Sequence, residues 1–121
     1  GYFHFVPGVA VPSSLKGLIE ETLDCIMKRT IHPVQIASDF LLRFLTIHPF
    51  HNGNGRMARL LVSYLLMKQG LPFPVMLTSG KRKSRSHYYR AIRLARHTPS
   101  DMREVNGLIL VSIHNTLINF K

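Results

Sequence analysis

A glycine-rich turn separates two apolar helical patterns, and it limits the fold more than any other feature of the chain. The first pattern ends near Thr46, the second begins near Arg56, and Gly53 and Gly55 lie between them. Glycine adopts backbone conformations that other residues resist, so the chain can reverse direction here within a few residues. The sequence therefore predicts two neighbouring helices joined by a tight loop.

The same turn carries the residues of an anion site. A turn of this kind at a helix start points several backbone N–H groups at one place. Arg56 and Arg59 are close enough to aim two guanidinium groups at the same anion, and His48 is a titratable base at the preceding helix end. These residues predict a phosphate cradle beside a general base. An isolated Gly-x-Gly-Arg is ordinarily only a solvated turn, and the spacing of a Walker A loop is absent.

The whole pattern resembles the signature of Fic-domain proteins, His-x-Phe-x-Asp/Glu-Gly-Asn-Gly-Arg-x-x-Arg. The residues that match are His48, Phe50, Gly53, Asn54, Gly55, Arg56 and Arg59. Members of that family typically transfer AMP from ATP to a Ser, Thr or Tyr hydroxyl of another protein and release pyrophosphate. The resemblance therefore implies a protein AMP-transferase with ATP as donor and a hydroxyl-bearing protein as partner.

The resemblance also implies a role for each signature residue. His48 takes the proton of the attacking hydroxyl. Asn54 and the backbone N–H groups around the glycines stabilise charge on the α-phosphate, and Arg56 completes the catalytic group. The residues expected to bind the phosphates are Gly53, Asn54, Gly55, Arg56 and Arg59. Phe50 is expected to anchor the loop in the core, whereas Tyr89 either lines the adenine pocket or packs in an aromatic cluster.

Asn52 departs from the family pattern, which has Asp or Glu at this position to bind Mg²⁺. An amide oxygen can bind Mg²⁺ but brings no charge, and no acidic residue occurs between Phe40 and Ser100. Three outcomes are open: retained transfer with Asn52 as a weak metal ligand and less dependence on Mg²⁺ or Mn²⁺, a changed nucleotide donor or transferred group, or nucleotide binding without turnover. The alternative function is therefore a non-catalytic module that binds nucleotide or an acidic partner.

The N-terminal residues match the family's flap, a β-hairpin that overhangs the active site. Phe3, Phe5 and Val6 lie in a short aromatic and β-branched run that predicts a strand, and a target segment would dock there by strand addition. The first flap strand would precede Gly1, so the chain resembles an excised fragment. Many members of the family carry an inhibitory helix, Ser/Thr-x-x-x-Glu followed by Gly or Asn, whose glutamate pairs with the second signature arginine, here Arg59. Ser100–Glu104 has this spacing, but Val105 follows it, so we expect a coincidence and an inhibitory segment outside this chain or in a partner.

The charge is strongly positive, with 16 Lys and Arg against 6 Asp and Glu. Seven of the basic residues lie between Lys81 and Arg96. This run is either a solvated helix face or a surface that attracts nucleotides or acidic proteins. Nucleic acid is disfavoured as a partner because no nucleic-acid-binding module accompanies the charge.

The periodicity predicts an all-α bundle with a short β element at its N-terminal end, in a single domain over residues 1–121. This layout resembles the Fic-like helical bundle, in which the β element would belong to the flap. The third helix is apolar nearly all round, which predicts that it runs through the middle of the domain. No apolar run reaches the roughly 18 residues of a membrane span. Cys25 is the single cysteine, which excludes an internal disulfide and is compatible with the cytoplasm without fixing the compartment. The expected helices are Leu15–Arg29, His32–Thr46, Arg56–Gln69, Ser84–Arg96 and Pro99–Asn119.

Overall fold

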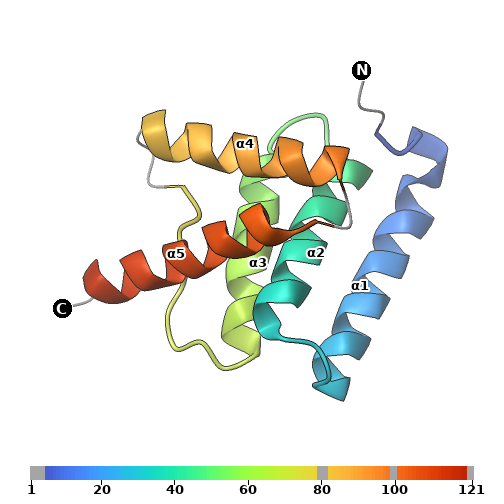
Figure 1. Ribbon diagram of the computed structural model, residues 1–121. Coiled ribbons are helices and arrows are strands. Elements are labelled where there is room, and N and C mark those ends of the chain that lie inside the picture. Colours follow the sequence, from blue (N-terminus) through green and yellow to red (C-terminus); the bar gives the residue numbers. More distant parts are fainter. Residues whose placement is uncertain (1–4, 79–81, 99–100, 120–121) are drawn as a thin grey trace.

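The computed structural model describes residues 5–78, 82–98 and 101–119. Its order is a 3₁₀ turn, η1 (Gly8–Ala10), followed by α1 (Val11–Lys28), α2 (Pro33–Ile47), α3 (Asn54–Lys68), α4 (Arg82–His97) and α5 (Arg103–Asn119). Helices α1, α2 and α3 lie side by side in one layer, and α4 and α5 cross this layer on one side (Figure 1). The predicted all-α bundle is confirmed.

Helix α2 is the centre of the bundle, because it packs against α1, α3, α4 and α5. Its buried residues are Val34, Ile36, Ala37, Ser38, Phe40, Leu41, Phe44, Leu45 and Ile47. The prediction that α3 would be central is wrong. Leu60 and Tyr64 of α3 are 67% and 58% exposed, so one apolar side of that helix faces outward.

Local signals explain the helix boundaries. Helix α1 begins four residues earlier than predicted because Pro12 lies in its first turn, where the missing N–H costs no hydrogen bond. His32 begins α2 by accepting a hydrogen bond at Nδ1 from the Val34 N–H at 3.1 Å. Helix α5 begins at Arg103, and Asp101 Oδ1 accepts from the Arg103 N–H at 3.2 Å.

The expected flap is described only in part. Phe3 lies outside the described residues, and Phe5 and Val6 are irregular rather than extended in a strand. The Val6 N–H donates to the Thr46 carbonyl at 3.1 Å, which ties this segment to the last turn of α2. The segment therefore runs next to the loop that follows α2. None of the described helices is both long enough and apolar enough to span a membrane.

Candidate active site

His48 ends α2 in the left-handed conformation, with φ 52° and ψ 59°. Its N–H donates to the Phe44 carbonyl at 3.0 Å, which completes the last turn before the chain departs into the loop. Left-handed backbone is uncommon outside glycine, and strained residues of this kind often lie at functional sites. The side chain is exposed, so the imidazole is accessible from solvent.

One face of the imidazole is covered by an aromatic ring. The rings of Phe5 and His48 stack with centroids 4.2 Å apart and an angle of 26° between their planes. The guanidinium of Arg96 in turn lies over the Phe5 ring, 5.7 Å from the ring centroid. Arg96, Phe5 and His48 thus link α4, the N-terminal segment and the end of α2. The sequence alone did not predict the roles of Phe5 and Arg96 in this stack.

The loop between α2 and α3 is closed by the side chain of Asn54. Its Oδ1 accepts from the Phe50 N–H at 3.0 Å, and its Nδ2 donates to the Phe50 carbonyl at 2.7 Å. Asn54 is 5% exposed, whereas the Phe50 side chain is 48% exposed. The prediction that Phe50 anchors the loop in the core is therefore wrong. The backbone of Phe50 is the fixed part, and the known tendency of Asn to bond nearby backbone was the available signal.

Gly53 and Gly55 shape the start of α3 in two different ways. Gly53 precedes the helix with φ 80°, a conformation that favours glycine. A Cβ at Gly55 would lie 3.0 Å from Arg59 Nη1, so any larger residue would push that guanidinium aside by a few tenths of an ångström. No side chain caps this helix start. Its first-turn N–H groups can therefore bind an anion, as the sequence predicts.

Arg59 connects the helix start to α4. Its guanidinium carbon lies 5.2 Å from the centroid of the Tyr88 ring. Tyr88 is 1% exposed, and its hydroxyl has no hydrogen-bond partner of ordinary geometry among the described residues. Burial raises the pKa of the Tyr88 phenol, and the adjacent Arg59 guanidinium offsets part of this rise. Tyr88 is therefore neutral at pH 7 and contributes an aromatic face beneath the Arg59 cation.

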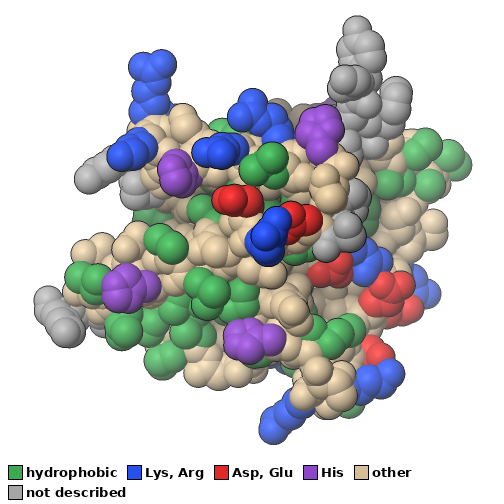
Figure 2. Space-filling view, in the orientation of Figure 1, with side chains coloured by type: hydrophobic (Ala, Val, Ile, Leu, Met, Phe, Trp, Pro, Cys, Tyr) green, Lys and Arg blue, Asp and Glu red, His purple; other side chains and the backbone are tan. Residues whose placement is uncertain are grey.

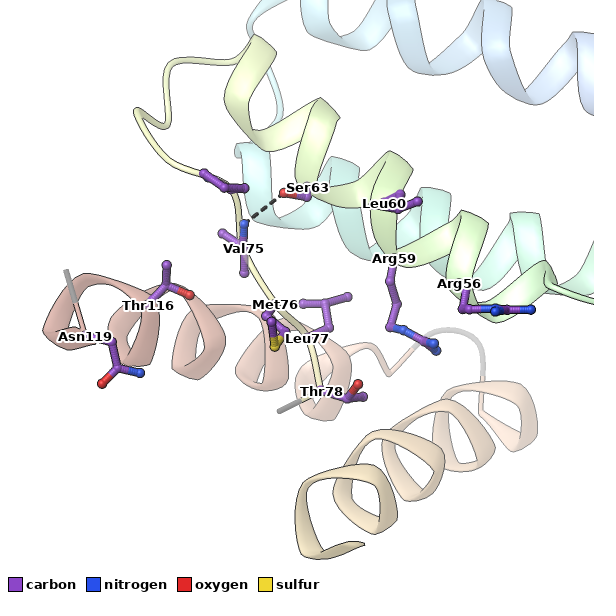
Figure 3. A pocket seen from close by; sticks show the side chains of 11 residues that line it. Arg56, Arg59, Leu60, Ser63, Val75, Met76, Leu77, Thr78, Thr116 and Asn119 are labelled. Carbon is purple, nitrogen blue, oxygen red and sulfur yellow. Dashed lines mark hydrogen bonds between the residues drawn. The ribbon is translucent and has the colours of Figure 1, made fainter. Parts of the chain in front are cut away.

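A largely apolar cavity of about 670 Å³ opens beside the two signature arginines. Arg56 and Arg59 lie at one end of it, and Leu60 and Ser63 follow along α3 (Figure 3). Ser63 Oγ accepts from the Val75 N–H at 2.8 Å and fixes the opposite wall. The remaining lining residues are Pro74, Val75, Met76, Leu77, Thr78, Thr116 and Asn119.

Tyr89 is not one of the residues that line this cavity. It is 57% exposed and packs edge-to-face against Tyr88, with ring centroids 5.2 Å apart. Contact with an adenine base therefore stays a prediction for Tyr89. The signature residues, His48 to Arg59, lie in one region, on the loop and the adjoining ends of α2 and α3.

The residues present fit a magnesium ion poorly. Asn52 is exposed in the loop, and no group of three or more His, Cys, Asp or Glu within residues 5–78, 82–98 and 101–119 could hold a metal. One neutral amide oxygen is a weak donor set, since Mg²⁺ binds through carboxylates together with substrate phosphates.

Comparisons with known proteins show the family of this chain. A model of the Fic/DOC family matches residues 5–66. The protein adenylyltransferase Fic of Drosophila melanogaster is 38% identical over 92 residues, which cover 76% of this chain and 18% of that protein. A Fido domain-containing protein of Dictyostelium discoideum is 28% identical over 112 residues, or 93% of this chain and 76% of that protein.

A solved structure of Fic-1 from C. elegans is similar over nearly the whole chain. It has a TM-score of 0.76 and 26% identity, and the match covers 99% of this chain and 34% of that one. The chain thus spans about a fifth of the length of the Drosophila relatives, 18%. The match includes the signature loop and all the described helices.

Proposed function

This chain belongs to the Fic/DOC family, and from that premise we propose that it transfers AMP from ATP to a Ser, Thr or Tyr hydroxyl of a protein substrate. The name of the Drosophila relatives, protein adenylyltransferase Fic, supports this activity. The observation that carries the proposal is the loop closed by Asn54, which holds His48 and the start of α3 on either side of one short turn.

In the proposed reaction His48 accepts the proton of the substrate hydroxyl, and the oxygen attacks the α-phosphorus of ATP. A bond forms between that oxygen and the α-phosphorus, and the bond from the α-phosphorus to the bridging oxygen breaks. Pyrophosphate leaves with the electron pair of the broken bond. The negative charge that develops on the phosphate oxygens is met by the N–H groups at the start of α3.

The two arginines have separate parts in this proposal. Arg56, exposed at the first turn of α3, binds the β-phosphate region. Arg59 binds the outer phosphate, and it forms no ion pair with an acidic residue among the described residues. Asn54 donates one amide N–H to Phe50, which leaves its second N–H for the α-phosphate. An inhibitory carboxylate from a segment or partner outside this chain would compete for Arg59.

One hydrogen bond limits how a target segment could dock on the N-terminal residues by strand addition. Strand addition uses backbone N–H and carbonyl groups, and the Val6 N–H is already bonded to Thr46. The Val6 N–H is therefore already used and is not one of the groups with which a target strand would pair.

The test is transfer of label from α-phosphate-labelled ATP to protein, with Mg²⁺ or Mn²⁺ and a cell lysate. His48→Asn is the sharpest control, because Asn tolerates left-handed backbone but cannot act as the base. The labelling rate should fall by roughly 10²–10⁴-fold or more in His48→Asn and in His48→Ala. Label that persists in both variants would overturn the proposed role of His48.

The alternative, nucleotide binding without transfer, is favoured by a single observation, Asn52 in place of a carboxylate. It predicts that ATP binds while no label reaches protein with either metal. Asn52→Asp separates the two cases, because it adds the acidic donor that Mg²⁺ prefers. Label that appears only in Asn52→Asp would show that the family reaction has been lost in this chain through that one residue.

A further inference from the structure

Helix α4 carries five exposed cations within twelve residues. They are Arg82, Lys83, Arg85, Arg90 and Arg93, and they form what we term the α4 basic face. The inner face of the same helix buries Tyr88, Ala91, Ile92 and Ala95 against the bundle. Because packing fixes the helix through its apolar side, the cations have a defined direction.

The α4 basic face lacks partners of opposite charge within the described part of the chain. The ion pairs recorded there use acids of α1 and α2, together with Asp101, which pairs with Arg103 at 2.8 Å. Glu104, in the first turn of α5, pairs with none of the five cations. Lys and Arg side chains gather over α4 in the space-filling view (Figure 2). Five like charges on one helix repel each other, so they do not stabilise the fold.

Helix α4 borders the proposed catalytic site through two contacts. Tyr88 lies against Arg59, and Arg96 lies over Phe5, which stacks on His48. A protein that brings its hydroxyl to the exposed imidazole therefore comes close to the C-terminal end of α4. The anion that Arg56 and Arg59 would bind is already supplied by ATP in the proposed reaction, so the α4 basic face is left for another anionic group.

We propose that the α4 basic face docks an acidic segment of the protein substrate, next to the hydroxyl that receives AMP. The inference rests on the proposed function, and it adds the chemical class of the substrate. An acidic protein is favoured over nucleic acid because the substrate itself must carry the hydroxyl. Of the aromatic residues of α4, Tyr88 is buried and Tyr89 alone is exposed, so the face lacks the series of exposed rings on which bases stack.

The experiment uses fluorescein-labelled peptides in which one Ser, Thr or Tyr is flanked by glutamates, with matched peptides in which Gln replaces every Glu. Fluorescence anisotropy measures their binding, and α-labelled ATP measures transfer to them. The test variant is R82Q/K83Q/R90Q/R93Q. The matched control, K16Q/K28Q/R29Q/K68Q, removes the same charge from α1, its C-cap and the far end of α3.

The wild type should bind the acidic peptides and discriminate against the Gln peptides by roughly tenfold, as several exposed charge pairs together provide. The test variant should lose this discrimination, with a raised KM for peptide and unchanged kcat and KM for ATP, whereas the control should keep it. Affinity should fall as NaCl rises from about 50 to about 200 mM.

Three results would overturn the docking surface: equal binding of acidic and Gln peptides, equal loss in the control variant, or tighter binding of a single-stranded oligonucleotide than of any acidic peptide. Failure of the proposed function has a different signature. Peptides that bind with the expected charge dependence, yet receive no label, would support the docking surface and count against transfer.

Discussion

At the scale of single residues, Gly55 is the position where one added methyl group has the clearest consequence. A Cβ there would lie 3.0 Å from Arg59 Nη1, so Gly55→Ala should shift the guanidinium by a few tenths of an ångström from its place over Tyr88. The expected result is a loss of ATP affinity of about tenfold, as for one charge-assisted hydrogen bond. Isothermal titration with ATP measures it.

The control for this variant is Gly107→Ala, because an added Cβ at Gly107 in α5 would meet nothing within 4 Å. Alanine should stabilise that helix by about 0.5–1 kcal/mol and leave ATP affinity unchanged. If both variants bind ATP like the wild type, the space over Gly55 has no part in phosphate binding.

Asn54 gives a second residue-scale prediction. Asn54→Ala removes both hydrogen bonds to the Phe50 backbone and leaves two partly buried groups without partners, which should cost about 1–3 kcal/mol of unfolding free energy. The loss should appear in urea denaturation without ATP, which separates a loop-closing role from a phosphate-binding one. Asn115→Ala, an exposed change in α5, is the control and should stay near the wild type. Unchanged stability in Asn54→Ala would contradict the loop-closing role.

The sequence predicted the place of His48 and of the two arginines because their spacing around the glycines sets it. It did not predict that Phe50 would be exposed, because an aromatic residue in a signature is equally consistent with a core position. Nor could spacing reveal that Phe5 stacks on His48, since that contact joins segments more than forty residues apart. Contacts within one turn are encoded locally, whereas contacts between segments depend on the fold.

At the scale of elements, five helices were predicted within a few residues of their observed bounds. Which helix lies at the centre of the bundle was not predicted correctly. Helix α3 is apolar nearly all round, yet Leu60 and Tyr64 are exposed, and Leu60 lines the cavity. Periodicity reports how much apolar surface a helix has but not which neighbour covers it. Helix α2 is central because four other helices pack on it, a property of the whole arrangement.

Two buried serines should respond oppositely to alanine. Ser63 accepts from the Val75 N–H at 2.8 Å, so Ser63→Ala leaves that N–H without its partner and should cost about 1–3 kcal/mol. The Ser38 hydroxyl, fully buried in α2, has no hydrogen-bond partner among the described residues. Ser38→Ala should therefore stabilise the protein, by about 1 kcal/mol. Urea denaturation of both variants checks this, and destabilisation by Ser38→Ala would contradict it.

The start of α5 should depend on pH through Asp101. Side-chain hydrogen bonding from Arg103 lowers the pKa of Asp101 to about 2 from its ordinary 3.8. A lowered folded-state pKa means that the stabilisation is complete above about pH 4 and is lost as the pH falls through about 2. The difference in urea midpoint between the wild type and Asp101→Asn should therefore be constant near neutral pH and shrink in acid. A difference that grows in acid would contradict the pairing.

At the scale of the whole molecule, charge is distributed unevenly over the bundle. Acidic residues lie on α1, on α2 and at the start of α5, whereas residues 41–98 carry cations only. Two ion pairs connect cations of α1 to acids one turn away, and Arg43 of α2 lies 2.7 Å from Glu21 of α1. The α1–α2 side is thus balanced internally, whereas the five cations of the α4 basic face form no ion pair with the described acidic residues.

This asymmetry predicts how salt changes the stability of the free protein. Unit charges about 10 Å apart repel by about 0.4 kcal/mol in water, and added salt screens that repulsion. The urea midpoint of the wild type should therefore rise as NaCl increases from about 20 to about 300 mM. R82Q/K83Q/R90Q/R93Q should be more stable at low salt and gain less from added salt, because it lacks most of the α4 repulsion.

K16Q/K28Q/R29Q/K68Q has the same net charge as R82Q/K83Q/R90Q/R93Q, yet we expect its urea midpoint to respond differently to salt. It removes the Lys16–Glu20 and Lys28–Asp24 pairs, at 3.9 Å and 2.8 Å, and leaves the α4 cations in place. Its midpoint at low salt should be no higher than that of the wild type, and its rise with salt should be at least as large. Equal behaviour of the two variants would mean that net charge alone governs stability. Opposite behaviour locates the repulsion on α4, where an acidic partner would relieve it.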